Sequence, residues 1–163
     1  MLKNACVAAL LMGALALAGC SSEPQEPAPA AETVDVGDAW VKGADTGMTS
    51  AFGRLVNTGS TEVRMVSATS PAAGSVELHE VASDGGAMVM RQKDGGFVLP
   101  AASEVELGPG GDHFMLMDIT EPLLPGDNIT IVATFDDGST LPITAQVRDF
   151  PGADEQYDPS AHG

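Results

Sequence analysis

The chain has 163 residues, the length of one domain, and its 23 acidic against seven basic residues give a formal net charge of −16. Such a charge repels nucleic acid and anionic lipid headgroups, so neither is an expected ligand. Two cysteines are present, Cys6 and Cys20, which leaves little room for a disulfide framework.

The first nineteen residues have the pattern of an export signal. A basic residue, Lys3, precedes an apolar run from Ala5 to Ala18 that is too short to cross a membrane comfortably. The stretch LAGC, which ends at Cys20, resembles a bacterial lipobox; the alternative is an ordinary signal peptide with a chance cysteine. The resemblance implies that residues 1–19 are a lipoprotein signal peptide and that Cys20 carries lipid. We therefore expect an extracytoplasmic, membrane-anchored lipoprotein of the periplasm or cell surface.

The segment after Cys20 has the composition of a tether. Residues 20–32 are rich in Ser, Glu, Pro, Gln and Ala and show no apolar periodicity, which predicts a flexible linker. With Cys6 removed and Cys20 lipidated, the folded part would hold no thiol. Thiolate catalysis and cysteine-based zinc sites are then excluded for that part.

Residues 33–150 consist of short apolar segments separated by Gly, Pro, Asp, Asn and Ser, without a sustained helical repeat. This pattern predicts one all-β domain, a sandwich or barrel of about seven to nine strands. The polar residues 151–163 are expected to form a disordered tail. The expected strands are 34–42, 49–57, 62–70, 74–82, 87–92, 103–108, 113–119, 128–135 and 139–147.

A cluster of histidine and methionine stands out within this domain. Alternate side chains of an extended strand share a face, so His113 and Met115 are expected to face the same side. Thioether sulfur and imidazole nitrogen suit Cu(I), whereas Mg²⁺ and Ca²⁺ prefer oxygen, and zinc prefers more imidazole, carboxylate or thiolate. The competing interpretation is that these side chains only pack. The cluster comprises His79, Met88, Met90, His113, Met115 and Met117.

The spacing of four of these residues resembles the periplasmic copper chaperones of the PCu(A)C family, once classed as a domain of unknown function. That family's motif is His, ten residues, Met, about 21 or 22 residues, then His-x-Met; here ten residues separate His79 from Met90, and 22 separate Met90 from His113 and Met115. The resemblance covers most of residues 33–150 and includes AWVK, FGRLVNTG and VELGPGGDHFMLMDI. It implies a cupredoxin-like or immunoglobulin-like Greek-key β-sandwich in which His79, Met90, His113 and Met115 bind Cu(I).

The resemblance also implies a role. Family members deliver copper towards the binuclear copper centre of cytochrome oxidase, often beside thioredoxin-fold copper chaperones, and are not enzymes. We expect a Cu(I) metallochaperone that delivers or buffers envelope copper, with at least one ligand exposed for hand-over by ligand exchange. The alternative is a surface-displayed β-sandwich interaction module without metal. An electron carrier of the blue-copper type ranks last, because such sites need a thiolate.

The remaining candidates are weaker. Met88 lies two residues before Met90, and Met117 lies two residues after Met115, so each is expected on the same strand face as its neighbour. Both could be alternative ligands, but packing is the preferred interpretation. The same holds for Met48, which could form a lip over the site. His162 lies in a tail without methionine, so we expect no second tight site there.

Overall fold

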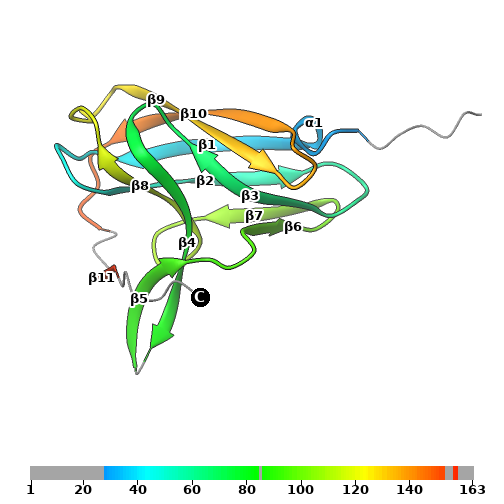
Figure 1. Cartoon of the computed structure of the whole chain (residues 1–163), viewed down its shortest axis with the longest axis horizontal. Helices are drawn as coiled ribbons and strands as arrows, with labels where there is room; N and C mark the ends of the chain where they lie inside the picture. Colours follow the sequence, from blue (N-terminus) through cyan, green and yellow to red (C-terminus); the bar gives the residue numbers. More distant parts are fainter. Residues whose placement is uncertain (1–27, 85, 153–155, 158–163) are drawn as a thin grey trace, which may run out of the picture.

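The computed structural model describes residues 28–84, 86–152 and 156–157 of the chain (Figure 1). The expected signal peptide, Cys20 and His162 lie outside these residues. The all-β class predicted from the sequence is confirmed, with one short helix beside eleven strands in the described part. The elements are α1 (Ala30–Thr33), β1 (Val34–Lys42), β2 (Thr49–Asn57), β3 (Val63–Thr69), β4 (Ala73–Asp84), β5 (Ala87–Gln92), β6 (Phe97–Leu99), β7 (Ser103–Leu107), β8 (His113–Ile119), β9 (Asn128–Phe135), β10 (Thr140–Arg148) and β11 (Gln156–Tyr157).

The strands pair into one sheet that closes on itself. Its order is β11-β5-β4-β8-β2-β1-β10-β9-β3-β6, with β7 paired to β2. A further pairing, Ala68 with Val76, joins β3 to β4 and closes a ring. Among the strands that the structure describes, only the pairs β1–β10 and β11–β5 are parallel. Because β5 and β11 lie beyond β4, outside this ring, the β4–β5 hairpin extends away from the body of the molecule (Figure 1).

The core fills the interior of the closed sheet. Alternation along β9 and β10 puts every second side chain inside. The buried residues are Ile129, Ile131, Ala133 and Phe135 of β9 and Ile143, Ala145 and Val147 of β10. The largest fully buried apolar side chains come from β1, β2, β3, β6, β7, β8 and β9. They include Leu55, Met65, Phe97, Leu99, Leu116, Ile131 and Phe135.

A tight turn carries the chain from β5 to β6. The N–H of Gly96 donates to the carbonyl of Lys93 at 3.1 Å, and Gly96 has a φ of 74°. A Cβ atom there would collide with the main-chain carbonyl of Met65. Only glycine satisfies both requirements, and the turn seats Phe97 in the core.

The N-terminal boundary differs from the expectation. The linker was expected to run to residue 32, but Ala30–Thr33 form α1 and Ala30 is buried. The main-chain N–H of Ala30 donates to Oδ2 of Asp137 at 2.7 Å, which ties α1 to the β9–β10 turn. At the other end, Gln156–Tyr157 of the expected disordered tail pair with β5 as β11.

Helical structure plays a minor part in the described residues. Within these ranges no helix combines the length and apolarity that crossing a bilayer requires.

Candidate metal centre

Three neighbouring strands bring the four candidate ligands to one face of the sheet. His79 on β4 lies directly opposite His113 on β8, and Met115 lies opposite Glu77. Across the other ladder Met90 on β5 lies opposite Val81, two residues beyond His79. Residues opposite one another, and residues two apart on a strand, share a face. His79, Met90, His113 and Met115 therefore share one face at adjoining positions.

All four side chains are buried. The exposed fraction is 0% for His79, 2% for His113, 2% for Met115 and 4% for Met90. The expectation that at least one ligand would be exposed is therefore wrong. The cause is that β8 is buried on both faces from His113 to Leu116, with Phe114 and Leu116 turned to the core.

Hydrogen bonds orient both imidazoles. Nε2 of His79 lies 2.7 Å from Oε2 of Glu77, and Nδ1 of His113 lies 2.9 Å from the carbonyl oxygen of Gly111. Both oxygens are acceptors, so the ring nitrogen that faces each one carries the proton. The lone pairs then lie on Nδ1 of His79 and Nε2 of His113, and both of these nitrogens are buried. The ring centroids are 5.6 Å apart.

A row of side chains continues from the histidines across β2 and β1. The ring of Phe52 lies 6.0 Å from that of His113, and Trp40 lies 4.6 Å from Phe52. On the same side Ser50 donates a weak hydrogen bond to the sulfur of Met115 at 3.5 Å. These contacts restrict the rotamers of His113 and Met115 before any ion arrives.

The opposite face of the same three strands carries a network of charges. Nζ of Lys93 lies 3.2 Å from Oε2 of Glu80 on β4 and 3.0 Å from Oδ1 of Asp112, just before β8. Arg91 on β5 donates to Oε1 of Glu80 through Nε at 3.0 Å and through its terminal nitrogen at 2.9 Å. Asp112 thus binds Lys93 through its carboxylate.

This network shifts two pKa values. Burial alone would lower the pKa of Lys93, but the carboxylates of Asp112 and Glu80 hold it above its ordinary value. Burial alone would raise the pKa of Glu80, but Arg91 and Lys93 hold it below its ordinary value. Each group thus favours its charged form, and the ion pairs link β4, the end of β5 and the start of β8.

The other methionines are distributed differently. Met65 is fully buried in the core. Met48 and Met88 are exposed by 43% and 55%, so they do not pack in the interior. Met117 lies opposite Ser75, further along the face that carries Met115, and is half-buried.

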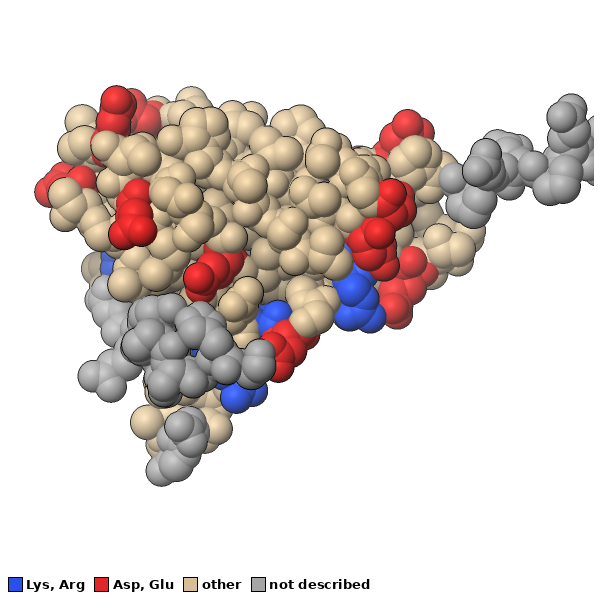
Figure 2. Space-filling model, in the orientation of Figure 1, with Lys and Arg blue, Asp and Glu red and all other residues tan. Residues whose placement is uncertain are grey.

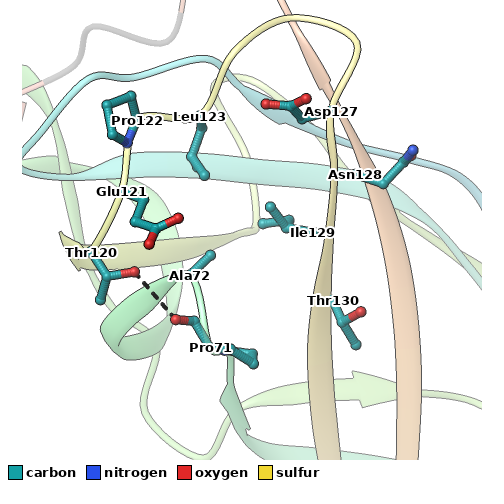
Figure 3. A pocket seen from close by; sticks show the side chains of 10 residues that line it. All are labelled: Pro71, Ala72, Thr120, Glu121, Pro122, Leu123, Asp127, Asn128, Ile129 and Thr130. Carbon is teal, nitrogen blue, oxygen red and sulfur yellow. Dashed lines mark hydrogen bonds between the residues drawn. The ribbon is translucent and has the colours of Figure 1, made fainter.

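A separate hollow of about 540 Å³ lies between the start of β4, the end of β8 and the start of β9 (Figure 3). Glu121 and Asp127 supply its carboxylates, and the hydroxyl of Thr120 donates to the carbonyl of Pro71 at 3.3 Å. None of the four candidate ligands lines it. This hollow is therefore not the histidine–methionine centre.

Sequence reasoning from residue types overlooked Glu77. The residue lies two positions before His79, and strand alternation puts the two side chains on one face. The two-residue spacing between Glu77 and His79 could have revealed this contact from the sequence.

Residues 34–147 match a family model described as "Putative lipoprotein LpqE-like". The chain belongs to this family. A relative, "Putative lipoprotein Lxx21020" of Leifsonia xyli subsp. xyli, is 45% identical over 96% of this chain and 95% of its own length. The LpqE-like domain thus makes up most of the folded part.

Solved structures share the fold of this LpqE-like chain. One is described as "Copper-bound PCuAC domain from PmoF2"; it is 20% identical, covers 77% of this chain and 100% of its own, and has a TM-score of 0.61. Another is described as "Solution structure of CuI-DR1885 from Deinococcus Radiodurans"; it is 26% identical, covers 75% of this chain and 84% of its own, and has a TM-score of 0.56.

Proposed function

We propose that the protein is an extracytoplasmic Cu(I) carrier that binds one ion through His79, Met90, His113 and Met115. One observation carries the proposal: the register of β5, β4 and β8 puts four soft or borderline donors at adjoining positions on one buried face. The sequence spacing alone could not ensure this, because the donors come from three strands.

The donor set suits a soft ion of low charge. Two thioethers and two neutral imidazoles bring no negative charge, so a buried monovalent ion needs less compensation there than a divalent one. Zinc sites usually hold more imidazole, carboxylate or thiolate. Closed-shell Cu(I) accepts the tetrahedral arrangement that four such donors can supply.

The comparisons support this assignment. The neighbours with the same fold include a copper-bound PCuAC domain and a protein described with CuI. Family membership supports a lipoprotein anchored to the membrane through Cys20. The recipient would be a copper-accepting protein, such as a cytochrome oxidase subunit or a thioredoxin-fold copper chaperone, and the carrier itself would catalyse no reaction.

Burial of the ligands shapes the transfer step. A recipient can reach the ion only after a side chain that covers it moves. Met90 is the ligand that would leave first, because β5 lies beyond β4 in the sheet order, on the projecting hairpin (Figure 1). His79, His113 and Met115 would hold the ion on β4 and β8 while a ligand of the recipient replaces the thioether.

The test is a Cu(I) competition titration against a chromophoric chelator. The whole chain is used in mild detergent, with Cys6→Ser and Cys20→Ser so that no thiol competes. We expect one tight equivalent, which Met90→Ala and His113→Ala both weaken.

Met88→Ala is the matched control, because it removes an exposed thioether from the same strand. Its affinity should equal that of the parent chain. If the parent does not compete for Cu(I), the carrier proposal fails and the interaction module becomes the better interpretation.

A further inference from the structure

Glu77 holds one of the two imidazoles of the proposed centre. Its carboxylate lies 2.7 Å from Nε2 of His79, and its side chain is 24% exposed while that of His79 is fully buried. Glu77 also lies opposite Met115 in the β4–β8 ladder. One carboxylate at the edge of the buried face therefore adjoins two of the four candidate ligands.

The contact decides which nitrogen of His79 can bind an ion. A carboxylate only accepts hydrogen bonds, so the shared proton lies on Nε2 and the lone pair on Nδ1. His113 has the opposite arrangement, because its Nδ1 faces the carbonyl of Gly111. The two histidines thus present different nitrogens.

The choice of nitrogen on each histidine would determine where a bound ion lies between β4 and β8. Nδ1 is bonded to Cγ and lies nearer the main chain than Nε2 does. An ion held by Nδ1 of His79 and Nε2 of His113 would therefore lie nearer to the main chain of β4 than to that of β8. Since β4 lies between β5 and β8, this brings the ion towards Met90, the ligand on the far strand.

We infer that Glu77 is a positioning residue that fixes the Nε2–H form of His79, so that the centre binds Cu(I) through Nδ1 of His79 and Nε2 of His113. The inference rests on the proposed function for its metal and on the observed Glu77–His79 contact for the tautomer. Contacts of this kind typically change metal affinity by about 10- to 100-fold.

The test has one readout that needs no copper. Long-range ¹H–¹⁵N NMR spectra of the metal-free chain report the tautomer of each histidine. We expect His79 as the Nε2–H form and His113 as the Nδ1–H form. Glu77→Ala should release His79 into a mixture of forms and leave His113 unchanged, since a main-chain carbonyl holds the latter.

The second readout is the Cu(I) competition titration on the same variants. Glu77→Ala should bind Cu(I) about 10- to 100-fold more weakly. Glu77→Gln keeps an acceptor oxygen without the charge, so it should restore the tautomer and most of the affinity. Glu106→Ala removes an exposed strand carboxylate elsewhere and should change neither readout.

Several outcomes would overturn the inference. The first is that His79 carries its proton on Nδ1 in the parent chain. The second is that Glu77→Ala leaves the tautomer and the Cu(I) affinity unchanged. The third is that Glu77→Gln binds Cu(I) as weakly as Glu77→Ala, which would mean that only the charge of Glu77 acts. A parent chain that does not bind Cu(I) overturns the proposed function and the metal assignment together. The metal-free spectra would still decide separately whether Glu77 sets the tautomer.

Discussion

At the scale of single residues, two methionines on one strand offer a sharp comparison. Met115 and Met117 share a face of β8, but Met115 is 2% exposed and lies opposite Glu77, while Met117 is half-buried and lies opposite Ser75. Leucine has nearly the volume of methionine and lacks the sulfur. Leucine substitutions at Met115 and Met117 can therefore distinguish a methionine that binds the ion from one that only packs.

We predict that Met115→Leu weakens Cu(I) binding while Met117→Leu leaves it unchanged. The loss at Met115 should exceed the roughly 10- to 100-fold that a lost supporting contact costs, because a ligand itself is removed. Either swap should cost less than about 1.5 kcal/mol of unfolding free energy. Competition titration and chemical denaturation measure the two quantities; equal affinity losses in both variants would contradict the assignment of Met115.

The candidate ligands could be named from the sequence, but their assembly could not. Alternation at i and i+2 predicts that His113 and Met115 share a face, and this holds. That His79 lies directly opposite His113 depends on the pairing of β4 with β8, strands separated by three others along the chain. Burial of the centre depends equally on distant packing, which explains why the expected exposed ligand was wrong.

At the scale of elements, the longer strands were predictable because each is an apolar segment of five or more residues bounded by Gly, Pro, Asp, Asn or Ser. The bounds of β1, β2, β5, β8 and β9 equal the predicted ranges. The three residues of β6 and the four of α1 are too few for a period to show, and both were missed. The charge network that links β4, β5 and β8 is non-local and left no pattern in the sequence.

That network gives an element-scale prediction. Lys93→Met breaks both contacts, to Glu80 and to Asp112, so we expect a loss of roughly 1–2 kcal/mol of unfolding free energy and faster hydrogen exchange in β5. Arg54→Met is the matched control, because it breaks one ion pair of 3.6 Å between half-exposed side chains. The prediction is wrong if both variants lose the same stability or if exchange in β5 does not change.

At the scale of the whole molecule, α1 and the projecting β4–β5 hairpin lie at different ends of the described domain. The described chain enters at α1, far along the long axis from the β4–β5 hairpin (Figure 1). The proposed lipid on Cys20 would attach the domain to the membrane from the side of the chain that leads into α1. Acidic side chains spread over the visible surface, while the few basic ones lie towards its lower edge (Figure 2). A recipient of opposite charge is favoured over most of that surface.

A charged carboxylate accepts the hydrogen bond that attaches α1 to the β-domain. The stability of the protein should therefore depend on pH in the acid range. The N–H of Ala30 and the N–H and hydroxyl of Ser139 donate to the Asp137 carboxylate, and these bonds hold its pKa below the ordinary value of 3.8. A carboxyl whose pKa is lower in the folded state stabilises that state above 3.8, and its contribution disappears as the pH falls through the folded-state value. We predict that Asp137→Asn is less stable than the parent chain at pH 7 and that the difference narrows below pH 3.8.

Chemical denaturation of both chains across this pH range measures the difference, and Asp136→Asn supplies the control. It removes the same charge from the adjacent residue without touching the bond to Ala30. A stability difference between the parent chain and Asp137→Asn that stays constant with pH would mean that Asp137 acts through the shape of its side chain and not through its charge. A stability difference that narrows only for Asp137→Asn would show that acid loosens the attachment of α1 to the β-domain, because protonation weakens the carboxylate's bond to the N–H of Ala30.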